Sequence, residues 1–128
     1  GEEPVSIQAL KTARDGVDGS LTAVLKYRSG AICAVDGGFD AQSALVSEIC
    51  GTKGSLLIRD TFADTGTPIL LTRDGVTEEV PVEPCSRYVL QMEDFADAIL
   101  NRRAPGFALA ETIRNCGIIE RILQTAKE

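Results

Sequence analysis

The chain has 128 residues, a length that fits one domain with a single hydrophobic core. Hydrophobic residues make up 44% and charged residues 25%, the balance of a globular protein, and no apolar run approaches the ~20 residues that a membrane span needs. The net charge of -6 argues against nucleic acid, whose phosphates bind to basic surfaces. We therefore expect one domain, over residues 1–128, that binds neither nucleic acid nor membrane.

The cysteines and the lack of histidine bear on metal and catalytic sites. The four cysteines are not clustered, and the chain contains no His, so we expect no metal site. Cys33, Cys50 and Cys116 have apolar neighbours and are predicted to be small buried thiols in a reducing cytoplasm; a disulfide between Cys33 and Cys50 is the alternative. Without His, the commonest general base near neutral pH is missing, and no nucleophile elbow or phosphate loop is present.

The first two thirds of the chain alternate with the period of β-strands. Short turns rich in Gly and Asp separate the runs, among them Arg73-Asp74-Gly75, which favours a hairpin. Gly37-Gly38 predicts a bulge, with close backbone approach as the alternative. The predicted strands are Val5 to Leu10, Ser20 to Tyr27, Ala31 to Asp36, Ser43 to Cys50, Ser55 to Ile58, Ile69 to Thr72 and Val76 to Val82.

Two helices follow the strands. Ser86 is a suitable N-cap for a helix that extends through Asn101, and residues 104–107 (Ala-Pro-Gly-Phe) end that element. A second helix is predicted from Leu109 to Ala126. Because strands precede helices instead of alternating with them, we predict an α+β fold. It has a mostly antiparallel, open-faced sheet of six or seven strands, with both long helices packed on one face.

The second face of this sheet is too apolar to be solvated along its whole length. Val24 alternates with Ala23 and Leu25, and residues 31–35 are almost wholly apolar. We expect this face to contact a second copy of the chain or another domain.

Three local motifs, in this order, resemble the C-terminal domain of the Gfo/Idh/MocA oxidoreductases, a family that includes glucose-fructose oxidoreductase and inositol dehydrogenase. The resemblance covers nearly the whole chain. The motifs are residues 27–31 (Tyr-Arg-Ser-Gly-Ala), residues 48–56 (Glu-Ile-Cys-Gly-Thr-Lys-Gly-Ser-Leu), and Tyr88-x-x-Gln91-Met92-Glu93-Asp94-Phe95-Ala96-Asp97-Ala98-Ile99 followed by Pro105 and a helix.

This resemblance implies a domain that shapes a sugar or polyol pocket and forms a homo-oligomer through its open sheet face. In the family an N-terminal Rossmann domain binds NAD or NADP. The chain lacks the glycine-rich fingerprint, the Glu-Lys-Pro motif and the Asp-x-x-x-His segment of that half. We therefore expect this chain to be a piece of a longer cytoplasmic enzyme. The piece itself has no catalytic residues, binds no cofactor and is inactive alone.

The resemblance also suggests residues that line a pocket. Gly38-Phe39-Asp40 is similar to a Gly-aromatic-Asp stretch near the substrate of inositol dehydrogenase relatives, so Phe39 and Asp40 are candidates; core packing is the alternative for Phe39. Tyr88 and Gln91, at the start of the first helix, are also candidates, with packing at the core edge as the alternative for Tyr88. Phe62, in a loop, is either a lid or a plug beneath the loop.

Three functions fit these observations. The leading one is the substrate-binding and dimerisation domain of an NAD(P)-dependent oxidoreductase acting on a sugar, polyol or related diol. The second is a non-enzymatic module whose open sheet face drives assembly. The third is an unrelated α+β ligand-binding domain.

Overall fold

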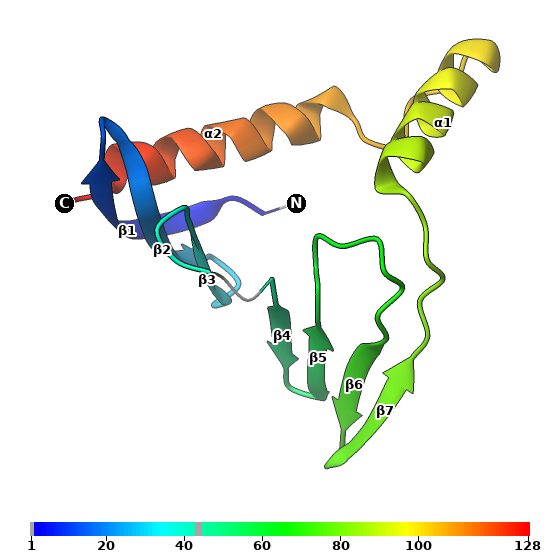
Figure 1. Ribbon diagram of the computed structural model, residues 1–128, viewed down its shortest axis with the longest axis horizontal. Helices are drawn as coiled ribbons and strands as arrows, with labels where there is room; N and C mark the ends of the chain where they lie inside the picture. Colours follow the sequence, from blue (N-terminus) through cyan, green and yellow to red (C-terminus); the bar gives the residue numbers. More distant parts are fainter. Residues whose placement is uncertain (1, 43–44) are drawn as a thin grey trace. The chain divides into compact units, whose positions relative to one another are not determined.

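The computed structural model describes residues 2–42 and 45–128, in which seven strands and two helices are found. The chain forms two compact units, one made of Gly1–Ser43 and Gly106–Glu128 and the other of Ala44–Pro105. Each unit contains one antiparallel sheet and one helix (Figure 1).

The first unit has a three-stranded sheet in the order β1 (Pro4–Arg14), β2 (Val17–Tyr27) and β3 (Ile32–Gly38). The turn between β1 and β2 places Asp15 at φ 52° and Gly16 at φ 81°, which is the backbone of a tight two-residue hairpin. The polar second half of β1 was not predicted as strand. It is extended because it pairs with β2 as far as Val17.

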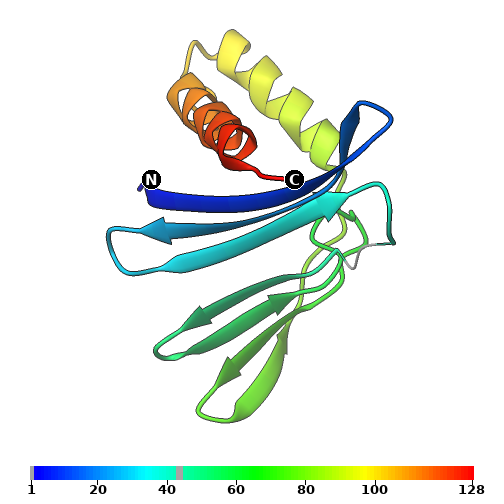
Figure 2. The same cartoon turned by 90° about the vertical axis from the view of Figure 1, so that its left-hand side faces the viewer.

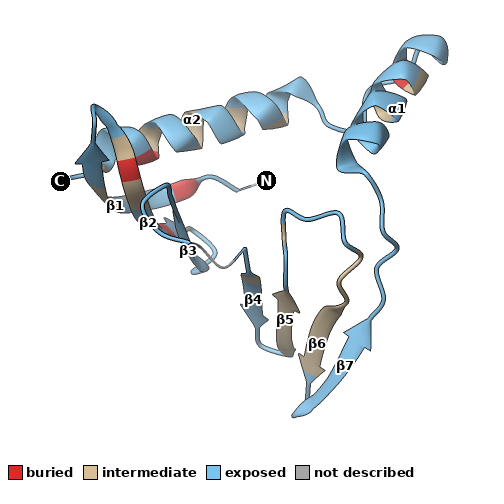
Figure 3. Ribbon diagram, viewed as in Figure 1, coloured by how far each residue is buried: buried red, intermediate tan, exposed pale blue. Residues whose placement is uncertain are grey.

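The core of this unit lies between the sheet and α2 (Leu109–Thr125). The register places Ala9 opposite Ala23, and these two small residues and Leu25 pack with Ile122 of the helix. Figure 3 shows the buried segments of the strands and of α2 in red. After the helix, Lys127 pairs with the edge of β1, donating its N–H to the carbonyl of Ala9 at 3.1 Å. The end of the chain is thereby held against the first strand.

The second unit has a four-stranded meander (Figure 2). Its strands are β4 (Ser47–Gly51), β5 (Gly54–Ile58), β6 (Ile69–Arg73) and β7 (Val76–Val80). The register gathers apolar side chains on one face, because directly paired residues share a face. They are Ile49, Leu56, Ile58, Ile69, Leu71, Val76 and Val80.

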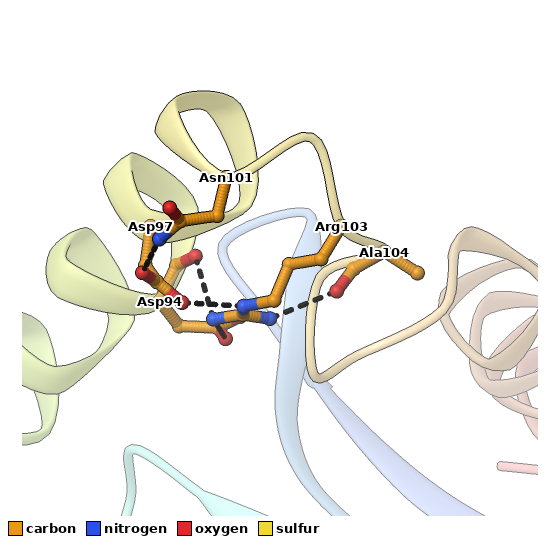
Figure 4. A network of polar contacts seen from close by, with 5 residues as sticks. All are labelled: Asp94, Asp97, Asn101, Arg103 and Ala104. Carbon is orange, nitrogen blue, oxygen red and sulfur yellow. Dashed lines mark hydrogen bonds and ion pairs between the residues drawn. The ribbon is translucent and has the colours of Figure 1, made fainter.

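The helix of the second unit is α1 (Arg87–Leu100), which begins after the predicted cap: the Ser86 hydroxyl accepts the Val89 N–H at 3.4 Å. Beyond its C-terminal end, Arg103 folds back onto the helix (Figure 4). The guanidinium lies 2.6 Å from a carboxylate oxygen of Asp94 and 2.5 Å from one of Asp97, and it also donates to the carbonyl of Ala104. This network fixes the first residues after the helix.

Most expectations about the fold are confirmed: an α+β fold, six or seven mostly antiparallel strands, of which the structure has seven, the hairpin turns and both helices. Among the described residues the strands form two hydrogen-bonded sheets, whereas one was expected. The helix α2 packs on the first sheet, but the placement of both helices on one face stays a prediction, as does the single domain. The predicted strand over 43–50 begins at Ser47, and residues 43–44 lie outside the described part of the chain.

Two expectations are wrong. No bulge occurs at Gly37-Gly38, where the β2–β3 register continues unbroken to the end of the strand; the irregularities lie between β1 and β2. A side chain at Gly38 would meet the Gly19 carbonyl at 2.7 Å, so close backbone approach explains this glycine. The cysteines are also not buried: all four are exposed free thiols, and none belongs to the small core of Ala9, Ala23, Leu25 and Ile122.

Candidate functional site

A shallow groove lies at one end of the first unit, beside the Gly37-Gly38 segment. The strand register aligns Lys11, Leu21 and Gly37 in one row across the three strands, on the face that α2 covers. Gly37 has no side chain, and no atom lies within 4 Å of where its Cβ would be, so the row is open at this point. The groove, of about 350 Å³, is lined by Asp18, Leu21, Val35, Asp36, Gly37, Gly38, Phe39 and Leu123.

Phe39 lies at the rim of this groove, and the residue is 91% exposed. The ring is therefore not part of the core of this unit. Its backbone is nonetheless held in place, because the Phe39 N–H donates to the Gly19 carbonyl at 2.8 Å. The position thus combines a fixed main chain with a free aromatic face.

The neighbouring Asp40 anchors the same segment to the first strand. Its carboxylate accepts a hydrogen bond from the Arg14 guanidinium at 2.7 Å. Gly19 makes room for it, since a Cβ at that position would lie 2.2 Å from the second carboxylate oxygen. Asp40 therefore positions the segment that carries Phe39, and its charge is already paired.

Asp18, one of the groove's lining residues, takes part in an ion pair. The Lys11 ammonium lies 2.8 Å from the Asp18 carboxylate, and the two side chains are 25% and 36% exposed. The hydrogen bond that the Lys11 ammonium donates to the Asp18 carboxylate raises the pKa of Lys11, so the ammonium stays protonated in the neutral range. The pair can bind polar groups, but Lys11 is poorly suited to accept a proton.

Sequence reasoning missed Lys11, Asp18 and Arg14. The sequence feature that could have found Lys11 is its position two residues after the core residue Ala9, because residues two apart in a strand share a face. A charged side chain on a core-facing row is unusual and needs a partner. Because the predicted first strand ends at Leu10, Lys11 lies outside it, and the sequence does not place its side chain on the core-facing side.

The other two candidates, Tyr88 and Gln91, lie one turn apart on α1 in the second unit. Tyr88 is 68% exposed, with the Arg87 guanidinium 5.5 Å from its ring centre, and Arg87 pairs with Asp64 at 3.4 Å. The structure thus brings Phe39 together with Asp40, and Tyr88 together with Gln91, as two pairs in different units. Their role in a pocket stays a prediction. Phe62 is 62% exposed and so is not a buried plug.

The described residues contain no group of three or more His, Cys, Asp or Glu that could hold a metal ion. In the part of the chain that the structure covers, no helix is long and apolar enough to cross a membrane.

Among known proteins, similar ones are found only by comparison of structures. No protein-family model matches the chain, and no curated protein matches it. Among solved structures, the aldose-aldose oxidoreductase of Caulobacter crescentus, complexed with glycerol, matches 97% of this chain with a TM-score of 0.79 and 21% identity. The UDP-N-acetylglucosamine 3-dehydrogenase GnnA of Acidithiobacillus ferrooxidans matches 96% with a TM-score of 0.78 and 16% identity.

A third solved structure is KijD10, a 3-ketoreductase of Actinomadura kijaniata in complex with NADP; it matches 98% of this chain with a TM-score of 0.82 and 18% identity. The chain spans 39% of the first two structures and 41% of the third. These matches confirm, at the level of the fold, the predicted resemblance. The chain has the fold of one part of each of these three oxidoreductases.

Proposed function

We propose that this chain is the substrate-binding and oligomerisation part of an oxidoreductase that acts on a sugar, polyol or related diol. The reaction is hydride transfer between a secondary alcohol of the substrate and NAD or NADP. The observation that carries this proposal is the overlap of almost the whole chain with sugar oxidoreductases, at TM-scores from 0.78 to 0.82. Because the chain spans about two fifths of those enzymes, the nicotinamide site and the proton-transfer residues are assigned to the rest of the polypeptide.

The contribution of this chain is to orient the substrate and to keep water away from it. Both effects lower the barrier without any covalent chemistry, since positioning alone supplies several kcal/mol when the geometry is good. The exposed side chain of Phe39 offers an apolar wall, and the groove beside it is lined by Asp18, which pairs with Lys11. No general base is needed within this chain for that role.

The test is an assay of the complete polypeptide that contains this chain. It is incubated with NAD or NADP and a panel of aldoses, polyols and inositols, and the absorbance of the reduced nicotinamide is followed. We expect turnover of at least one member of the panel. A polypeptide that binds neither nucleotide, measured by calorimetry, contradicts the proposal.

The second candidate is a non-enzymatic assembly module, and exposed apolar surface favours it. Leu10, Val24 and Ile32 share the face of the first sheet opposite α2, and all three are exposed. A polypeptide that forms a stable oligomer but binds no nicotinamide nucleotide has this function. The third possibility, an unrelated ligand-binding domain, is disfavoured by the overlap with the oxidoreductases along nearly the whole chain.

A further inference from the structure

The ion pair of Lys11 and Asp18 occupies an unexpected place in the first unit. Along β1, Lys11 continues the row of Ile7 and Ala9, which faces the core under α2. An apolar residue would be the ordinary choice there, because a charged side chain on a half-buried face loses solvation. The pair therefore does not extend the apolar core, and its member Asp18 lines the groove that Phe39 borders.

The pair has unused hydrogen-bonding capacity. An ammonium group carries three donors and a carboxylate has two acceptor oxygens, whereas the contact at 2.8 Å uses one donor and one oxygen. Among the described residues, no other hydrogen bond or ion pair to either charged end is found, and Glu128 acts on Lys11 only through its charge. A charged acceptor, Asp18, thus lines the groove, and a charged donor, Lys11, lies beside it at 2.8 Å.

The rest of the groove is mainly apolar. Leu21, Val35 and Leu123 line it, Gly37 leaves space between them, and the free face of Phe39 borders it. A ligand that fits must present C–H groups to these side chains and hydroxyls to the ion pair. A pyranose or cyclitol ring has this amphipathic character.

We propose that Lys11 and Asp18 together recognise two adjacent hydroxyl groups of the substrate: one hydroxyl donates to the Asp18 carboxylate, and its neighbour accepts from the Lys11 ammonium. This proposal rests on the proposed function, and it names the polar residues that determine specificity for a vicinal diol. Phe39 packs against the ring carbons, and the pair selects ligands by their hydroxyls.

Two probes that differ by one hydroxyl test the proposal. The protein is titrated with cis-1,2-cyclohexanediol and with cyclohexanol, and binding is followed by saturation-transfer NMR of the ligand protons. Because a hydrogen bond to a charged group is strong, we expect the diol to bind about tenfold more tightly than the monoalcohol. Equal affinities for the two probes overturn the proposal without the need for any variant.

Variants assign the preference to the pair. Asp18→Asn and Lys11→Met should each remove most of the preference for the diol, whereas Asp15→Asn, in the adjacent turn, should leave it intact. Circular dichroism checks that each variant is folded. If Asp18→Asn binds the diol as the unaltered protein does, the recognition role is wrong.

The same variants separate this proposal from the proposed function. A diol preference that depends on Asp18, in a protein without nicotinamide-dependent turnover, supports the recognition pair and contradicts the oxidoreductase. Turnover of a sugar with kcat/KM unchanged in Asp18→Asn supports the oxidoreductase and overturns the recognition pair.

Discussion

At the scale of single residues, the backbone around the hairpin of β4 and β5 depends on one of its two glycines. Gly54 has φ 148°, in a region that side-chain-bearing residues rarely adopt, and a Cβ there would lie 2.1 Å from the carbonyl oxygen of Thr72. Gly51, at the other end of the turn, has its nearest potential contact at an ordinary 3.6 Å. The two positions look equivalent in the sequence, but only Gly54 is sterically required.

We expect Gly54→Ala to lower the free energy of unfolding by about 1–3 kcal/mol, because both the backbone conformation and the neighbouring strand oppose a side chain. Gly51→Ala is the matched control and should change it by less than about 0.5 kcal/mol. Urea denaturation followed by circular dichroism measures both. Equal effects of the two substitutions would show that close approach to β6 does not constrain the turn.

The carboxylate of Asp97 makes the end of α1 sensitive to acid. Hydrogen bonds from Arg103 and Asn101 lower its pKa below the usual value of about 3.9. A carboxyl group with a depressed folded-state pKa contributes stability that is fully present above its unfolded pKa and is lost as the pH falls through the folded value. The contribution of Asp97 should therefore be intact at neutral pH and disappear progressively below about pH 4.

The melting temperature measured against pH tests this expectation. Asp97→Asn should melt below the unaltered protein at pH 7, and the gap should close as the pH falls below about 4. Glu93→Gln, on the same helix and without an ion pair in the structure, should show no such pH-dependent gap. If the difference in melting temperature between Asp97→Asn and the unaltered protein is constant with pH, the charge of Asp97 does not contribute to stability.

At the scale of elements, the two helices differ at their N-terminal ends. Ser86 caps α1, whereas α2 begins after Ala108, which has extended backbone angles but no side chain that can accept a hydrogen bond. Three residues later stands Glu111, the spacing of a capping box. The helix thus lacks one stabilising contact that its sequence almost provides.

Ala108→Ser should raise the free energy of unfolding by about 0.5–2 kcal/mol, because the new hydroxyl can accept a free N–H of the first turn. Ala110→Ser introduces the same side chain inside the helix, where it should be slightly destabilising. Chemical denaturation distinguishes the two. If both substitutions destabilise the protein equally, the start of α2 does not require a cap.

The elements also show how far the sequence alone leads. Period-two alternation and turns rich in Gly and Asp are sufficient to predict six or seven mostly antiparallel strands, and Ser86 and residues 104–107 are sufficient to delimit α1. The polar half of β1 was missed because its extension depends on pairing with β2, which no local pattern encodes. The groove was missed for the same reason. Lys11, Asp18 and Phe39 come together only through the strand register and a turn.

At the scale of the whole molecule, the proposed oligomer depends on the uncovered face of the first sheet. Val24 lies in the middle of this face, between Gln8 and Ala34 in the paired strands, and is 45% exposed. Burial of such side chains drives association, and a charge in the centre of the contact opposes it.

Val24→Glu should convert the oligomer into a monomer in sedimentation velocity experiments, while the circular dichroism spectrum stays unchanged. Val17→Glu, beside the β1–β2 turn and 62% exposed, should leave the assembly intact. An unaltered protein that is monomeric at high concentration, or a Val24→Glu variant that still assembles, shows that this face is not the contact.

The measurement that tests the central claim most directly compares kcat/KM of the complete polypeptide for its best sugar or polyol in Phe39→Ala and in Phe107→Ala. Both rings are almost fully exposed, at 91% and 86%, but only Phe39 borders the groove. We predict that Phe39→Ala lowers kcat/KM at least about tenfold through the loss of apolar contact with the substrate, and that Phe107→Ala leaves it unchanged. Equal values for the two variants, or the absence of any nicotinamide-dependent turnover, would contradict this account.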